Sequence, residues 1–214
     1  MVLKNNVLVS LASAGILSGL ENDKRYNQLI ETMTMANENF SAETYWAYGC
    51  NCLMGDGISQ NGHGPAIDEI DTTCKKYKDC IKCVKMEFGE ECINNDFRYR
   101  IRQTDSGKIT CKDDGETCKR AICECDKMFA ESHALVADQY NQDYHMFYSM
   151  IGWNPEEQCV IPGPSSTPQV NQQCCGPAVG PKSIFNTATG KKCCADGTIQ
   201  TSCDGEPVYP EEPY

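Results

Sequence analysis

The sequence predicts a mainly α-helical, disulfide-rich domain followed by a small cysteine-rich module. Sixteen cysteines, an even number, indicate disulfides, and an aromatic content of 8% is lean for a chain of 214 residues built on one apolar core. Two long helices are expected, over residues 65–88 and 118–140. Pro65 suits a first helical position, and Asp68 and Asp71 follow where negative charge favours a helix N-terminus. Cysteines on both segments could join the two helices side by side.

The charge balance argues against one class of function. Nineteen Lys and Arg stand against thirty Asp and Glu, so the formal net charge is −11, whereas nucleic-acid binding relies on a cationic surface. Metal-bound thiols are the alternative interpretation of the cysteines, but His63, His133 and His145 fall in none of the usual zinc spacings. We expect these histidines at the surface. Disulfides favour an extracellular compartment.

Residues 1–25 have the pattern of a secretory signal followed by a short propeptide. Lys4 precedes an apolar stretch over residues 7–20, which is too short to span a bilayer, and the segment ends in the dibasic pair Lys24-Arg25. A first helix of the mature fold is the alternative. No later segment is apolar enough over a sufficient length to cross a membrane, so the sequence predicts a secreted protein without a transmembrane segment.

The main domain is expected over residues 26–160. It should open with a short amphipathic helix over residues 26–37, because three apolar side chains recur on one helical face: Leu29, Ile30 and Met33. An N-glycosylation sequon follows at Asn39, which marks a surface turn in an exported chain.

The remaining segments divide by composition. Residues 48–64 form a glycine-rich loop of a kind that often holds an ion, and the alternation within residues 89–115 predicts a loop with a small hairpin. Residues 161–173 are rich in proline and serine and predict a linker. Residues 174–214 hold two dicysteine units and an acidic tail, which predicts a small disulfide module.

Three blocks of the main domain resemble secreted phospholipase A2. They are Tyr48-Gly49-Cys50-Asn51-Cys52, then Asp-Thr-Thr-Cys-Lys-Lys-Tyr-Lys-Asp-Cys at residues 71–80, then Cys-Lys-Arg-Ala-Ile-Cys-Glu-Cys-Asp-Lys at residues 118–127. They follow the family's order and spacing, and the resemblance covers about residues 26–159. It implies two antiparallel, disulfide-linked helices, an N-terminal helix, a metal loop and a small β-wing.

The resemblance also implies a disulfide pairing. The implied pairs are Cys52–Cys74, Cys80–Cys125, Cys92–Cys118 and Cys111–Cys123, with Cys50 joined to a late cysteine, most simply Cys159. One family bridge is missing at both ends, because Thr73 and Ser132 stand where its cysteines would be. The six cysteines left unassigned are Cys83, Cys174, Cys175, Cys193, Cys194 and Cys203. Six allow fifteen pairings, so an intermolecular bridge and an oligomer stay open.

The catalytic residues that the resemblance implies are replaced. The family uses a histidine as general base beside an aspartate that binds calcium, and these positions fall on Tyr77 and Lys78. A phenol with a pKa of about 10 is a poor base at neutral pH. An ammonium group is worse where a dication needs a carboxylate oxygen, so we expect no cofactor and no calcium at the family site.

Other family positions are partly kept. The carbonyl-donating loop positions fall on Asn51, Leu53 and Gly55. Asp126 matches the aspartate that orients the family's histidine, and here it could accept a hydrogen bond from Tyr77 or pair with Lys78 as a structural remnant. Leu29, Ile30 and Met33 match the wall of the family's lipid channel, although core packing would select the same residues.

Two further features bear on function. Four lysines recur at spacings of three, four and three along the first long helix, and they form either a solvated face or a lipid-binding stripe: Lys75, Lys78, Lys82 and Lys85. The C-terminal module weakly resembles the dicysteine repeats of galaxin-type matrix proteins.

The sequence therefore predicts a catalytically inactive, secreted phospholipase A2-like protein. Its expected partner is an extracellular protein, a matrix associated with calcium or mineral, or a phospholipid surface, and not nucleic acid. The alternatives are a weakly active phospholipase A2 and a membrane-perturbing toxin without hydrolysis, for which some snake-venom relatives with lysine at the metal position give the precedent.

Overall fold

The computed structural model describes residues 23–52, 62–94, 96–160 and 171–203 of the chain. The helices are α2 (Lys24–Ala36), α3 (Ala42–Tyr45), α4 (Glu69–Phe88), α5 (Cys118–Ala134) and α6 (Pro155–Gln158), with short 3-10 turns at Glu90–Cys92, Ala137–Gln139, Gln142–Tyr144 and Thr187–Thr189. The strands are β1 (Ile101–Gln103), β2 (Ile109–Cys111), β3 (Gln172–Cys175), β4 (Ser183–Asn186), β5 (Lys192–Cys193) and β6 (Ile199–Gln200).

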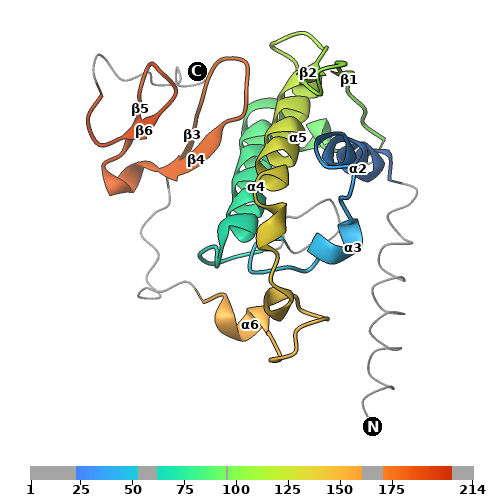
Figure 1. Ribbon diagram of the computed structural model, residues 1–214. Helices are drawn as coiled ribbons and strands as arrows, with labels where there is room; N and C mark the ends of the chain where they lie inside the picture. Colours follow the sequence, from blue (N-terminus) through green and yellow to red (C-terminus); the bar gives the residue numbers. More distant parts are fainter. Residues whose placement is uncertain (1–22, 53–61, 95, 161–170, 204–214) are drawn as a thin grey trace.

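Helices α4 and α5 form the centre of the domain and lie side by side (Figure 1). They are antiparallel, because Tyr77 stacks on Phe129 while the later residue Cys80 is bonded to the earlier residue Cys125. Helix α2 packs against α5. The mainly α, disulfide-rich fold predicted from the sequence is confirmed.

Side-chain caps fix where the long helices begin. The carboxylate of Asp68 accepts a hydrogen bond from the backbone N–H of Asp71 at 2.8 Å, and the hydroxyl of Thr117 accepts one from Arg120 at 3.3 Å. Helix α4 begins at Glu69, four residues after the predicted start, because Asp68 and not the region of Pro65 supplies the cap. It ends at Phe88, and the C-cap Gly89 has a φ of 86°, which suits glycine.

The second long helix is shorter than predicted. We expected it to reach about residue 140, but α5 ends at Ala134 and gives way to a 3-10 turn. The buried stripe of the helix ends at His133, and the next apolar residue, Leu135, is 82% exposed. Val136 and Tyr140 still pack against the core, but they do so from either side of the 3-10 turn and not from a continued helix.

The start of α2 moves the predicted boundary between leader and domain. We took Lys24-Arg25 as the end of a propeptide, yet both residues lie in the first turn of α2, whose N-cap is Asp23. The expected signal segment over residues 1–22 lies outside the described residues. The sequon residue Asn39 is exposed in the turn that follows α2. Within the described residues, no helix has the length and apolarity needed to cross a membrane.

All sixteen cysteines are paired within the chain, and none is free. Five bridges are those implied by the resemblance: Cys50–Cys159, Cys52–Cys74, Cys80–Cys125, Cys92–Cys118 and Cys111–Cys123. The six unassigned cysteines form Cys83–Cys174, Cys175–Cys193 and Cys194–Cys203. The open expectation of an intermolecular bridge is therefore wrong for this structure, because no thiol remains to make one.

The C-terminal module consists of two antiparallel hairpins, β3 with β4 and β5 with β6, and it lies against α4 (Figure 1). It begins with β3 at Gln172, two residues before the predicted start, while residues 161–170 of the predicted linker lie outside the described residues. Cys83–Cys174 fixes the module to α4, and Lys182 adds an ion pair with Glu87 at 2.5 Å.

Candidate functional site

Tyr77 and Lys78 are adjacent residues of α4. They occupy the positions at which the resemblance implies a general base and a calcium-binding aspartate, and they face different surroundings. Successive side chains on a helix are about 100° apart, so neighbours in sequence can reach separate environments. Tyr77 is fully buried between α2 and α5, whereas Lys78 is half-buried and reaches the loop before α4.

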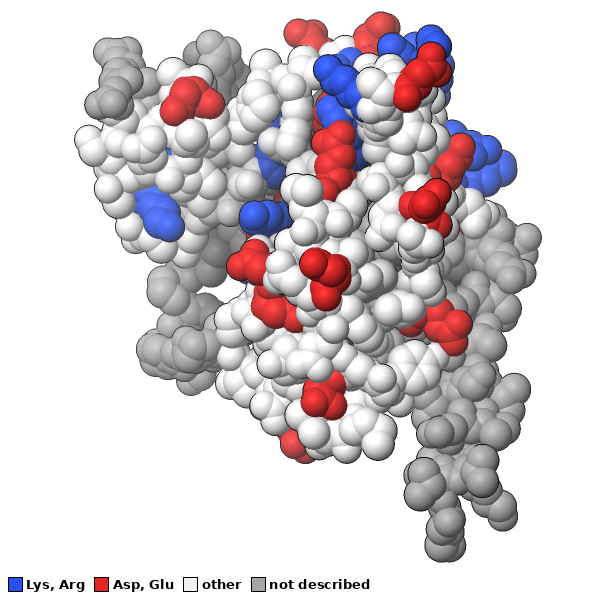
Figure 2. Space-filling view, in the orientation of Figure 1, with Lys and Arg blue, Asp and Glu red and all other residues white. Residues whose placement is uncertain are grey.

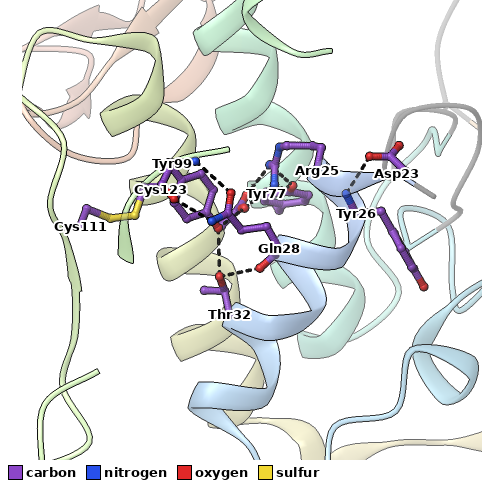
Figure 3. A network of polar contacts seen from close by, with 10 residues as sticks. Asp23, Arg25, Tyr26, Gln28, Thr32, Tyr77, Tyr99, Cys111 and Cys123 are labelled. Atoms are coloured by element: carbon purple, nitrogen blue, oxygen red, sulfur yellow. Dashed lines mark hydrogen bonds and ion pairs between the residues drawn. A yellow bond between two sulfur atoms is a disulfide. The ribbon is translucent and has the colours of Figure 1, made fainter. Parts of the chain in front are cut away.

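Tyr77 belongs to a buried polar network that includes Arg25 and Tyr99 (Figure 3). The carboxylate of Asp126 is the centre of this network. The guanidinium of Arg25 donates to both carboxylate oxygens, at 2.5 and 2.6 Å. The hydroxyls of Tyr77 and Tyr99 donate to the same carboxylate at 3.1 and 2.6 Å. The Arg25 and Asp126 side chains are 2% and 0% exposed. Asp126 is thus compensated in charge and accepts four hydrogen bonds.

Helix α2 also positions Tyr99. The side-chain amide of Gln28 donates to the Tyr99 carbonyl at 2.7 Å and accepts from its backbone N–H at 3.0 Å. The hydroxyls of Thr32 and Tyr99 lie 2.9 Å apart. Three residues of α2 therefore organise the network, since Arg25, Gln28 and Thr32 all project from it toward Tyr99 and Tyr77 (Figure 3).

The network holds its phenols protonated. Burial raises the pKa of Tyr77 well above its ordinary value and outweighs the opposing charge of Arg25. The pKa of Tyr99 is raised well above its ordinary value by the same cause. Burial by itself would lower the pKa of Arg25, but the nearby charge of Asp126 keeps it above its ordinary value. At neutral pH the site therefore contains one cation, one carboxylate and two neutral phenols.

The ammonium of Lys78 is held by neutral oxygens. Its Nζ donates to Oδ1 of Asn51 at 2.8 Å and to the carbonyl of Gly62 at 2.5 Å. Burial lowers the pKa of Lys78, and the positive charge of Lys75 lowers it further. Leu53 and Gly55, the other two loop positions named from the sequence, lie outside the described residues.

A second carboxylate, Asp71, holds the ends of the same loop. Its carboxylate accepts hydrogen bonds from the backbone N–H groups of Cys50, Asn51 and Ile67 at 3.0, 2.6 and 3.1 Å. It also accepts one from the side-chain amide of Asn51 at 3.1 Å. Gly49 has φ +59°, and a Cβ there would lie 2.6 Å from Cγ of Asp71. The sequence analysis had given Asp71 only a role in starting the helix.

The residues proposed for a lipid channel line a cavity that is almost closed. Leu29, Ile30 and Met33 meet Tyr77 and Phe129 around a volume of about 10 Å³. A single water needs about 10–15 Å³ measured in this way, so the space is too small for an acyl chain. Leu29 and Met33 are 1% and 2% exposed, which is the packing of core residues.

The prediction of surface histidines is wrong for two of the three. His133 and His145 are fully buried, while His63 is exposed as predicted. The rings of His133 and Tyr45 meet edge-on with their centroids 4.2 Å apart, and neither ring nitrogen of His133 has a hydrogen-bond partner within the described part of the chain. Burial lowers the pKa of His133 to about 4. No histidine contacts Asp126 among the described residues, where Arg25 and the two phenols take its oxygens.

Within the described residues, no group of three or more His, Cys, Asp or Glu side chains gathers in a way that could hold a metal ion.

Comparison with known proteins agrees with this architecture. The phospholipase A2 family profile matches residues 25–145. This chain belongs to the phospholipase A2 family. It is 31% identical over 142 residues to the group IID secretory phospholipase A2 of Mus musculus, which is 66% of this chain and 90% of that protein.

Two other relatives have similar identity to this chain. The chain is 29% identical over 129 residues to the basic phospholipase A2 Tgc-K49 of Trimeresurus gracilis, covering 60% of this chain and 85% of that protein. It is 29% identical over 121 residues to a phospholipase A2 of Calliactis polypus, covering 56% and 70%. The family match stops before the C-terminal module, whose resemblance to galaxins stays a prediction.

The sequence analysis missed Arg25 as a site residue. Arg25 was expected in a propeptide and Tyr99 lay within the segment 89–115 expected to form a hairpin, although both contact Asp126. Of the two partners considered for Asp126, Tyr77 is in place and Lys78 reaches the loop instead. A buried cation facing Asp126 has no local signal, because Arg25 lies 101 residues away in sequence.

Proposed function

We propose that this protein is a secreted, catalytically silent member of the phospholipase A2 family that acts as an extracellular binding or matrix component. One observation carries the proposal: the carboxylate of Asp126 is fully engaged by Arg25 and two phenols, one of which, Tyr77, stands where the family's general base would be.

The first argument concerns proton transfer. A general base must be able to accept a proton near neutral pH. Burial moves the pKa of Tyr77 away from that range, and its hydroxyl is already a donor to Asp126. The phenol is also fully buried, so it has no contact with a water that could act as nucleophile. These features support the absence of the family's hydrolytic chemistry.

The second argument concerns the metal. Calcium prefers six to eight oxygen ligands, commonly carboxylates and carbonyls. The position expected to supply a carboxylate holds the ammonium of Lys78, which occupies the Asn51 side-chain oxygen and the Gly62 carbonyl. The residues present do not fit a divalent cation, because the ammonium would repel it and compete for the same oxygens.

The third argument concerns the substrate. Hydrolysis of a phospholipid requires an acyl chain to enter beside the reacting groups. The cavity of about 10 Å³ between Leu29, Met33 and Phe129 leaves no room for one. Three independent requirements therefore point to the same conclusion.

The extracellular assignment rests on redox chemistry and on the relatives. Eight intrachain disulfides are typical of an oxidising compartment. The similar group IID protein is named as secretory. The formal net charge of −11 is compatible with weak, diffuse attraction of cations, which is the basis of the matrix alternative.

The test is fatty-acid release from phospholipid vesicles in millimolar calcium, with an active secreted phospholipase A2 as positive control. We expect no release by this protein, and no restoration in the double variant Tyr77→His/Lys78→Asp, because the acyl cavity stays closed and Arg25 still holds Asp126. Calorimetry should show no tight one-to-one calcium binding. Release that depends on calcium and stops with a chelator would overturn the proposal.

A further inference from the structure

A cleft of about 710 Å³ lies where the C-terminal module meets α4. One wall is the lysine row of the helix, Lys75, Lys78, Lys82 and Lys85, whose spacings place all four on one side of the helix. The opposite wall is the β3–β4 hairpin, through Gln172, Ile184, Phe185 and Asn186, and the loop of residues 62–65 closes the end. The lysine row, for which the sequence left a solvated face or a lipid-binding stripe as alternatives, therefore faces a second wall.

The charges in this cleft do not cancel. Lys75 pairs with Asp79 at 3.2 Å and Lys85 with Glu90 at 2.9 Å. Among the described residues, Lys78 donates its hydrogen bonds to neutral oxygens, and no carboxylate forms an ion pair with Lys82. Among the described residues that line the cleft, four ammonium groups stand against two carboxylates, and the buried carboxylate of Asp71 behind Asn51 is a third, so these residues carry a net positive charge. By contrast, acidic side chains are spread over the face of the helical domain seen in Figure 2.

The lysines influence one another across this space. Burial lowers the pKa of Lys78, the charge of Lys75 lowers it further, and Lys82 adds to this lowering, while the carboxylates of Asp79 and Asp71 oppose it. The cleft therefore combines a partly buried ammonium group with neighbouring lysines of the same charge.

The second wall is fixed in place. The disulfide Cys83–Cys174 starts from the residue next to Lys82, and Cys174 pairs with Ile184 in the β-ladder. The ion pair of Lys182 with Glu87 lies close by on α4. The hairpin is therefore anchored directly beside the uncompensated lysine, and Phe185 and Ile184 supply an apolar surface opposite it. A preformed site loses little free energy to ordering when it binds a ligand.

We propose that this cleft binds a dianionic phosphate or sulfate group, which Lys78 and Lys82 contact through charge-assisted hydrogen bonds. The net positive charge of the lining favours an anion with several acceptor oxygens, and the amides of Gln172 and Asn186 offer further donors. The apolar wall suits a ligand whose anionic group is attached to a hydrocarbon, so the source is either a lipid headgroup or a free anion. The inference rests on the binding role proposed above, but not on the loss of hydrolysis.

The test is calorimetric titration of the full-length, oxidised protein with sodium sulfate, inorganic phosphate, and a lysophosphatidic acid below its micelle concentration. We expect binding that weakens as salt rises. Binding of all three assigns the site to the bare anion, and binding of the lysolipid alone assigns it to a headgroup; both support the proposal. Absence of binding by all three at millimolar concentration overturns it.

The decisive variants are Lys82→Gln and Lys76→Gln, two exposed lysines of the same helix of which only Lys82 lines the cleft. We expect Lys82→Gln to weaken binding about tenfold, the effect of one charge-assisted hydrogen bond, and Lys76→Gln to leave it unchanged. Equal losses in both variants would show non-specific attraction and overturn the site.

The two proposals fail separately. Anion binding by a protein that hydrolyses phospholipid would remove the silent role and leave this site standing. An inactive protein that binds none of the anions would overturn this site and leave the proposed silent role standing. Thermal unfolding of both variants should match the wild type, since each substitution affects an exposed side chain.

Discussion

Helix α4 separates two charged regions that are compensated in different ways. On the side of α2 and α5, Arg25 and Asp126 neutralise each other, and their remaining hydrogen-bonding capacity is largely met by Tyr77 and Tyr99. On the side of the module, Lys78 and Lys82 have no carboxylate partner among the described residues. The first region is closed to solvent, whereas the second is open to it through a cleft.

The difference follows from the free-energy cost of burying charge. An ion removed from water loses several kcal/mol of solvation, so a fully buried guanidinium has to find its counter-charge inside the protein. A half-exposed lysine loses less and can leave its compensation to water or to a ligand. The buried region is therefore suited to holding the fold together, and the open region is suited to binding.

The largest expected effect comes from breaking the buried pair. Arg25→Leu leaves the Asp126 carboxylate buried without a cation, and we expect the free energy of unfolding to fall by about 3–5 kcal/mol. Urea unfolding at pH 7 with intact disulfides measures it. The matched control is Lys24→Gln, whose ion pair with Asp96 is exposed and should leave stability nearly unchanged. Similar values for the two variants would contradict the assigned role of Arg25.

A second prediction uses pH, because His133 is buried on the closed side without a counter-charge. Its pKa of about 4 in the folded protein lies below the ordinary value of 6.5, so the unfolded chain binds the extra proton between these values. The contribution of neutral His133 to the free energy of unfolding is therefore complete above pH 6.5. It is lost as pH falls toward 4, by at most about 3 kcal/mol.

Urea unfolding from pH 7 to pH 4.5 tests this prediction. His133→Phe keeps an aromatic ring beside Tyr45 and removes the titration, so its stability should fall less steeply with acid than that of the wild type. Parallel pH profiles for the two proteins would show that His133 is not the group responsible.

The smallest effect is expected on the open side. Lys182→Gln removes the ion pair with Glu87 between module and helix, and because both side chains are partly exposed we expect a loss below about 1 kcal/mol. Lys192→Gln, an exposed lysine of the same module, serves as the control in thermal unfolding. A loss as large as that of Arg25→Leu would mean that the two regions do not differ as described.

Much of the fold could be predicted because its signals are local. The end of α4 follows from Gly89, whereas its start was predicted four residues too early, at Pro65, because Asp68 is the residue that caps the helix. The end of α5 was predicted too late, because it depends on where the buried stripe runs out rather than on a breaking residue. Local sequence patterns do not show where the buried face of a helix ends.

The site was predicted only in part for the same reason. Tyr77, Lys78 and Asp126 could be named from a motif, since they sit at fixed distances from cysteines. Arg25 could not, because its role depends on how α2 packs on α5. The cleft was also out of reach, since six cysteines allow fifteen pairings and only Cys83–Cys174 brings the module to the lysines.

That bridge also decides what a protease would leave behind. Besides the backbone, Cys83–Cys174 is the one covalent bond between the module and the rest of the chain, since the other two module bridges are internal. A cut between Cys159 and Cys174 would therefore release no fragment until a reductant is added. On gels, the nicked protein would migrate as one species without reductant and as two with it.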